Sequence, residues 1–364
     1  MSKPTYLYVL SSSCQMYSGT GRVTFDWLHY ARRDFDFSVI IDSQYPINVS
    51  VTNDVCRKLD IPMYLSAPLN MPGCADSGVR GLAAHLTRHH YDFIECISWA
   101  NAAANSALLA SRPAKSRLLY TPHSQPLWTL GSTTRFFMTS TIFQRMLLES
   151  DATFVLSRTE VTLPEFAGCD PARIHYTPNG VDTHQFHSVG NRKRGQVLCV
   201  CDFRERRKRV DLLIAAFERA TLLNPNLRLV LAGRDSDRVQ LPSALIPLTS
   251  RLGYVTSEEL VHLYQTSSLL ALLSDYEAFG LPIAEALCCG TPVLLNDVPV
   301  QRDLFDGLPG VYFTRNTDLN DSSRCLARYA VLQHDFDSIS KAAAAAFCFD
   351  STYGRKRKIV FDLI

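Results

Sequence analysis

Short apolar runs alternate with longer amphipathic stretches along most of this chain. In the first half, the apolar runs have the length of β-strands, and the segments between them repeat their apolar residues at helical spacing. The predicted strands are Thr5–Leu10, Phe37–Asp42, Met63–Ser66, Phe93–Ile97, Arg117–Thr121, Thr153–Ser157 and Arg173–Pro178. The predicted helices are Val23–Arg33, Val79–His89, Ala102–Ala110 and Ser140–Leu148. Alternation of this kind is typical of an α/β fold with a parallel, doubly wound sheet.

The alternation restarts after the polar segment His184–Arg194, which we interpret as a linker. The second set of predicted strands is Val197–Cys201, Leu227–Ala232, Ile246–Leu252, Leu269–Leu273, Val293–Leu295 and Val311–Phe313. The second set of predicted helices is Leu212–Ala220, Ser257–Tyr264, Pro282–Leu287, Leu319–Leu332 and the alanine run Ala342–Ala346. We therefore expect two Rossmann-like domains, at residues 1–185 and 195–346, that face a central cleft at the carboxyl ends of their strands.

The composition agrees with this division and narrows the class of protein. A length of 364 residues with 46% hydrophobic and 20% charged residues supplies two ordinary domain cores, and a net charge of +2 does not favour nucleic acid as a partner. The 11 cysteines are odd in number and contain no C-x-x-C pair, which argues against a disulfide framework or a zinc site. Reduced thiols favour a cytoplasmic location. No apolar stretch reaches the length of a membrane span.

The most informative segment carries two carboxylates, Glu277 and Glu285, with seven residues between them. Phe279–Leu281 (Phe279, Gly280 and Leu281) forms a loop with free backbone N–H groups, and Pro282 suits the first turn of a helix. That helix contains Glu285 and ends at Gly290, a residue suited to a left-handed helix end. A loop that contains glycine and opens a helix is an anion site.

This E-x7-E segment, followed by Cys-Gly-Thr-Pro-Val, resembles the retaining nucleotide-sugar glycosyltransferases of family 4, the glycosyl transferases group 1 with the GT-B fold. The resemblance implies that Glu277 contacts the transferred sugar and that Glu285 accepts hydrogen bonds from the ribose hydroxyls. It also implies that residues 347–364 cross back onto the first domain.

The basic run at residues 204–209 departs from the pattern of this family. Lys208 matches the lysine that stabilises the leaving diphosphate, but Asp202 stands where the family has an arginine. Arg204, Arg206 or Arg207 could take the place of that arginine, because guanidinium groups bind phosphate in a forked geometry. We assign Arg204 to the donor site and Lys208 to catalysis.

Three further positions gain roles from the resemblance. Gly19, Gly21 and Arg22 follow the first predicted strand and would approach the donor diphosphate and the acceptor. His123 follows the strand Arg117–Thr121 and would help to shape the transition-state site as a catalytic residue. The backbone of Tyr254 and Val255 would line the nucleotide base, while Thr256 or Ser257, with Glu259, has the pattern of a helix cap.

We expect no metal ion and no other cofactor. The D-x-D at Asp235–Asp237 lies in a loop of this family, so fixed cations rather than a divalent metal would neutralise the diphosphate. The expected partners are a nucleotide-sugar donor and a hydroxyl acceptor, which could be a glycan or lipid-linked. Membrane contact would be peripheral at most.

Two alternatives stay open at this point. An NAD-type oxidoreductase could use Gly19, Gly21 and Asp42, although it leaves Lys208 and the two glutamates unexplained. The second alternative is a non-catalytic binding or scaffold protein derived from a transferase, and Asp202 is the only feature that supports it.

Overall fold

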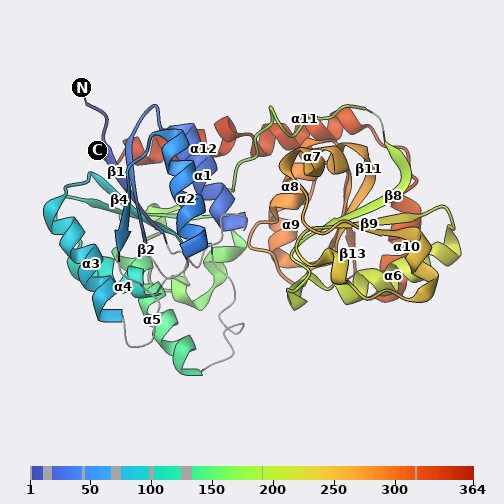
Figure 1. Cartoon of the computed structure of the whole chain (residues 1–364), viewed down its shortest axis with the longest axis horizontal. Helices are drawn as coiled ribbons and strands as arrows, with labels where there is room; N and C mark the ends of the chain where they lie inside the picture. The colour runs from blue at the N-terminus through green and yellow to red at the C-terminus, as the bar shows by residue number, and fades with distance from the viewer. Residues whose placement is uncertain are drawn as a thin grey trace. The chain divides into compact units, whose positions relative to one another are not determined.

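The computed structural model describes residues 2–10, 19–42, 46–66, 75–97, 102–123, 133–190, 192–315 and 318–364. The chain forms two compact units, Met1–Pro178 with Tyr353–Ile364, and Asn179–Thr352 (Figure 1). The first unit therefore ends at Pro178, where we had placed the boundary at 185. The chain returns to the first unit at Tyr353, later than the expected 347. Whether the two units face a common cleft stays a prediction.

The first unit contains a seven-stranded parallel sheet in the order β3-β2-β1-β4-β5-β6-β7. Its strands are β1 (Thr5–Leu10), β2 (Asp36–Asp42), β3 (Met63–Ser66), β4 (Phe93–Ile97), β5 (Arg117–Thr121), β6 (Ala152–Val155) and β7 (Ile174–Tyr176). Its helices are α1 (Gly19–Ala31), α2 (Pro46–Leu59), α3 (Ala75–Arg88), α4 (Ala102–Ser111), α5 (Thr133–Glu149) and most of α12 (Phe349–Phe361). This arrangement confirms the predicted doubly wound α/β fold.

Separate clusters of side chains cover the two faces of this sheet. Mostly aliphatic residues of α3, α4 and α5, with Phe143 of α5, pack on one face against alternate strand residues such as Leu7 and Val9. Aromatic residues pack on the other face, where Tyr6 contacts Phe35 and Trp27 of α1 contacts Tyr353 of α12. Side chains of successive strand residues point to opposite faces, which is why Tyr6 and Leu7 belong to different layers.

The second unit contains a six-stranded parallel sheet in the order β10-β9-β8-β11-β12-β13. Its strands are β8 (Lys193–Val200), β9 (Arg228–Ala232), β10 (Thr249–Arg251), β11 (Ser267–Leu272), β12 (Val293–Asn296) and β13 (Val311–Thr314). Its helices are α6 (Val210–Leu223), α7 (Ser257–Thr266), α8 (Leu281–Cys288), α9 (Pro299–Phe305), α10 (Leu319–Tyr329) and α11 (Phe336–Phe347). Helix α6 packs on α10, and α8 packs on α11.

The structure differs from the sequence-based elements at a few places. Residues Ser243–Leu248 form a 3₁₀-helix that contains Pro247, so the strand predicted at Ile246–Leu252 shortens to β10. Proline lacks the N–H group that a strand would donate, which explains the late start. Strand β8 begins at Lys193, inside the predicted linker. Helices α2, α9 and α12 were not predicted.

Candidate functional site

The carboxyl ends of β8 and β11 bring together the basic run and the first glutamate of the E-x7-E segment. These strands are parallel neighbours in the second sheet, so the loops that follow them leave the same edge side by side. After β8, a 3₁₀ turn at Arg206–Lys208 precedes α6, and after β11 a loop at 273–280 precedes α8. The two loops are joined by a hydrogen bond from the Asp275 N–H to the Arg207 carbonyl, at 2.8 Å.

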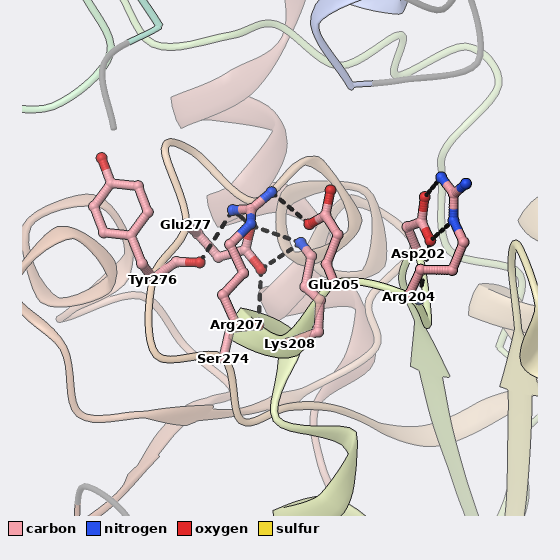
Figure 2. A network of polar contacts seen from close by, with 8 residues as sticks. All are labelled: Asp202, Arg204, Glu205, Arg207, Lys208, Ser274, Tyr276 and Glu277. Carbon is pink, nitrogen blue, oxygen red and sulfur yellow. Dashed lines mark hydrogen bonds and ion pairs between the residues drawn. The ribbon is translucent and has the colours of Figure 1, made fainter. Parts of the chain in front are cut away.

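Lys208 and Glu277 form an ion pair in this position (Figure 2). The Lys208 Nζ atom lies 2.7 Å from Oε1 and 2.9 Å from Oε2 of Glu277, and the two side chains are only 11% and 6% exposed. Ser274 Oγ donates a further hydrogen bond to Glu277 Oε1, at 2.8 Å. The cation and the carboxylate predicted to act together therefore occupy one protected point at the sheet edge.

Arg207 is the arginine of the basic run that lies beside this pair. Its NH1 donates to the Tyr276 carbonyl at 3.3 Å and lies 3.8 Å from Glu277 Oε2, while its NH2 lies 2.6 Å from Glu205 (Figure 2). Arg207 was one of three arginines that the basic run offered, although we assigned Arg204. The 3₁₀ turn directs Arg207 and Lys208 toward the same carboxylate, that of Glu277.

The charges around Glu277 keep it ionised. Burial alone would raise the pKa of this carboxyl group, but the charges of Lys208 and Arg207 and the hydrogen bonds from Lys208 and Ser274 outweigh burial and lower the pKa. The site therefore presents an anion held by two cations. A ligand with negative charge could draw those cations away from Glu277 and leave the carboxylate for a hydroxyl group.

The structure places Arg204 elsewhere, in a pair with Asp202. Its Nε and NH2 atoms donate to the two oxygens of Asp202 at 2.9 and 2.6 Å, and both residues lie to one side of the Lys208–Glu277 pair in Figure 2. The hydrogen bond from Arg204 is the main reason why the pKa of Asp202 is lowered. Our assignment of Arg204 to a ligand stays a prediction that this pairing disfavours.

The loop and helix after Glu277 have the predicted conformation. Gly280 precedes α8 with φ of 91°, Pro282 lies in the first turn, and Gly290 follows the helix with φ of 81°. The side chain of Phe279 is buried against Phe305 and Phe347, so Phe279 can offer a ligand only its backbone. Leu281 is also buried.

Glu285 lies inside the first turns of α8 and is 2% exposed. Tyr264, at the end of α7, donates its hydroxyl to Glu285 Oε2 at 3.0 Å. Arg192 fixes the ends of both helices, because its NH1 donates to the Tyr264 carbonyl at 2.6 Å and to Thr291 Oγ1 at 2.7 Å. This role of Arg192 was not predicted, since Arg192 lies in the segment that we interpreted as a linker.

The candidate residues of the first unit lie at the start of helix α1 and just after the end of strand β5. Gly19 and Gly21 open α1, and Arg22 lies 4.0 Å from Asp26, whereas residues 11–18 of the preceding loop lie outside the described residues. His123 follows β5 with the unusual φ of 48°. Burial and the charge of Lys356 lower the pKa of His123 to about 4, so the imidazole is neutral near pH 7.

The remaining candidates lie at the surface of the second unit. Tyr254 is 65% exposed, next to a capping box in which Thr256 and Glu259 exchange hydrogen bonds as predicted. Val255 lies between them and is half-buried. Asp235 of the D-x-D lies 3.8 Å from Arg238. Within the described ranges, no group of three or more metal-ligating side chains occurs.

Sequence profiles of two families match two adjacent parts of the chain. Residues 19–180 match the profile described as glycosyl transferase 4-like domain, and residues 182–326 match that of glycosyl transferases group 1. This chain belongs to the group 1 glycosyltransferases, and its fold is GT-B. Membership of this family gives no support to the oxidoreductase alternative.

Curated relatives are distant and match in part. Mannosylfructose-phosphate synthase of Agrobacterium fabrum is 27% identical over 245 residues, which are 57% of this chain and 54% of that protein. D-inositol 3-phosphate glycosyltransferase of Rhodococcus jostii is 32% identical over 179 residues, which are 43% and 39% of the two chains. The chain thus spans about half the length, or less, of these relatives.

Solved structures share the whole fold at low identity. Sucrose-phosphate synthase from Thermosynechococcus elongatus superposes with a TM-score of 0.78 at 17% identity and covers 99% of both chains. Anabaena HepE, in complex with UDP and glucose, has a TM-score of 0.76 at 16% identity and covers 99% of this chain and 100% of its own. In the part of the chain that the structure describes, no helix has the length and apolar character needed to cross a membrane.

Proposed function

We propose that this protein transfers a hexose-type sugar from a nucleoside-diphosphate sugar to a hydroxyl acceptor, with retention of the anomeric configuration. The observation that carries the proposal is the buried Lys208–Glu277 pair with Arg207 beside it. Bond cleavage in such a donor leaves negative charge on the diphosphate and positive charge on the sugar ring. The site holds two cations that can stabilise the negative charge of the diphosphate and a carboxylate that can stabilise the positive charge of the sugar ring.

In the proposed mechanism, the bond between the anomeric carbon and the β-phosphate oxygen breaks first. Lys208, Arg207 and the N–H groups at the start of α8 stabilise the departing diphosphate. The acceptor oxygen attacks the same face of the sugar, and its proton passes to the departing phosphate oxygen. Glu277 orients the sugar through its hydroxyls, and His123 is our candidate for a further contact with the sugar.

Arg207 is our candidate for the arginine that the family has at the position of Asp202. Its guanidinium group already lies on the tight turn that carries Lys208, and its contact with Glu277, at 3.8 Å, is weak enough to exchange for a phosphate oxygen. Because both cations are fixed by the protein, we propose that transfer needs no divalent metal.

Glu285 is our candidate for the ribose site. Its carboxylate is oriented by Tyr264 at 3.0 Å, one turn into the helix whose N-terminus would face the diphosphate. The acceptor would be a glycan, a lipid-linked sugar or another alcohol. The HepE complex holds UDP and glucose, which makes UDP-glucose the first donor to try. We place the reaction in the cytoplasm, as the cysteine pattern favours.

A thermal-shift panel tests this proposal. Wild-type protein is heated with UDP-, GDP- and ADP-sugars, each with the free nucleotide as its control, and the best donor is then followed by NMR. A ligand at 100 times its Kd stabilises the folded state by about 2.7 kcal/mol. We expect one base to raise the melting temperature and the product to keep the donor's anomeric configuration. An inverted product, or binding without any turnover, would refute the proposal, and the second outcome would favour the scaffold alternative.

A further inference from the structure

A buried ion pair lies in the first unit, far along the chain from the site in the second unit. Lys356 of α12 places its Nζ atom 2.7 Å from Oε1 of Glu95 on β4, and the side chains are 7% and 0% exposed. Two hydroxyl groups, those of Tyr6 on β1 and Thr121 on β5, also donate to the Glu95 carboxylate. Glu95 therefore ties three strands and the C-terminal helix together.

Stability alone does not explain a buried ion pair at this position. Apolar residues of similar volume usually stabilise a core as well as, or better than, a buried ion pair. Here the ammonium group is also surrounded by rings, with the Trp27 centroid at 4.7 Å and the Phe154 centroid at 4.8 Å from Nζ. These contacts fix the position of the positive charge closely. A fixed charge in a dry layer acts strongly on nearby groups.

His123 is the candidate catalytic residue on which this charge acts. It follows Thr121 by two residues, so the hydroxyl that Glu95 holds lies at the base of the segment that carries the imidazole. The φ of 48° at His123 is rare for a residue other than glycine and persists only where the surroundings hold it. Burial and, second, the positive charge of Lys356 lower the pKa of His123 to about 4, so the imidazole stays neutral near pH 7.

We propose that the Glu95–Lys356 pair is a positioning device for His123. Glu95 holds the end of β5 through Thr121, and Lys356 sets the charge that the imidazole faces. This inference rests on the proposed function, because His123 contacts a sugar only in that reaction. It gives the C-terminal helix a part in transfer, although none of its residues would touch the substrate.

The first test replaces both charges at once, as Glu95→Gln with Lys356→Met. The amide oxygen of glutamine accepts from one of the two hydroxyl groups, of Tyr6 or Thr121, and its NH2 group donates to the other. Methionine fills the space of the lysine stem, so the variant should fold and melt close to wild type. We expect kcat to fall by about 10- to 100-fold, the scale of a misplaced catalytic group. The Kd for the free nucleoside diphosphate should stay unchanged. An unchanged kcat in the folded variant would overturn the proposal.

A matched control separates this role from docking of the helix. Arg357, the next residue of α12, forms a second ion pair of this helix, with Asp34 at 2.9 Å. Arg357→Met should leave kcat as in wild type, and an equal loss there would show that helix docking is responsible. In addition, His123→Ala should make the loss from the double replacement disappear. Losses that multiply would mean that the pair does not act through His123.

A pH titration of His123 tests the coupling without any measurement of sugar transfer. Burial raises the pKa of Tyr6 and Tyr8 well above the usual value, so these two neighbours of Glu95 stay neutral during the titration. Nitrogen-15 NMR of the histidine rings should show the pKa of His123 rise from about 4 when both charges are removed. An unchanged pKa would contradict the coupling. Absence of sugar transfer by wild-type protein would instead refute the proposed function, and this titration would still decide whether pair and imidazole are coupled.

Discussion

Replacing Lys208 by methionine separates the charge of this residue from its packing. Methionine keeps the apolar stem but removes the ammonium group that lies 2.7 Å from Glu277 Oε1. Glu277 is then buried with one hydrogen bond from Ser274 and with Arg207 at 3.8 Å. Loss of one partner of a buried pair costs about 3–5 kcal/mol. Because Arg207 remains close, we expect a loss of about 2–3 kcal/mol in the free energy of unfolding.

The effect on transfer should be separable from this loss of stability. Removal of one group that stabilises developing charge lowers kcat by about 100- to 1000-fold, or about 2.7–4 kcal/mol of activation free energy. The second variant, Lys208→Met with Glu277→Gln, removes the orphaned charge and should regain most of the stability while kcat stays low. Denaturant unfolding and steady-state turnover of the same preparations measure the two effects.

Arg204→Met is the matched control, because it removes a cation from the same loop. Arg204, whose side chain is 51% exposed, pairs with the half-buried Asp202, so its loss should change unfolding by less than about 1 kcal/mol. The reasoning about Lys208 is refuted if Lys208→Met loses stability but keeps kcat within about threefold of wild type, since the lysine would then be structural. An equal loss of kcat in Arg204→Met would restore the original assignment of Arg204 to the donor.

Three further predictions concern other parts of the chain. Burial and the neighbouring His89 lower the pKa of His85 to about 4, so between pH 6.5 and 4 the unfolded chain binds more protons than the folded chain and stability falls as the pH falls. In thermal unfolding, His85→Gln should make this loss of stability less steep, and an unaltered slope would contradict the prediction. Gly290→Ala should lower the free energy of unfolding by more than about 1 kcal/mol, because a Cβ atom would lie 2.5 Å from the Phe336 carbonyl oxygen at a positive φ, and an unchanged denaturation midpoint would be the contrary result. Asp235→Ala should be nearly silent in turnover assays and activity should survive EDTA, whereas loss on chelation with recovery in manganese would mean that a metal holds the diphosphate.

The sequence predicted the sheets well because buried parallel strands are short, apolar and separated by amphipathic helices. Strands such as β1, β3 and β4 were predicted with their observed bounds. Helix α12 was not predicted, because Gly354 and the four cations that follow it interrupt the helical spacing of its apolar residues. Its buried residue Lys356 also looks like a solvated lysine in the sequence, and only the fold brings it to Glu95.

The candidate site divides in the same way. Glu277, Gly280 and Gly290 lie in a segment whose local spacing sets both the loop and the helix, so their arrangement followed from sequence. The ion pair of Lys208 with Glu277 was not predicted, because it forms only where the fold makes β8 and β11 neighbours. The choice of Arg207 over Arg204 depends on a single 3₁₀ turn and on the local pair with Asp202, which residue types alone do not determine.

Calorimetric titration shows whether Glu277 acts on the transferred sugar and Glu285 on the ribose. The free nucleoside diphosphate and its sugar conjugate are each titrated into wild type, Glu277→Gln and Glu285→Ala, and turnover is measured on the same samples. We expect Glu277→Gln to bind the free nucleotide like wild type but to lose turnover. Glu285→Ala should bind both ligands more weakly, because ribose is common to them. Variants that both bind and turn over like wild type would contradict the assignment of this site.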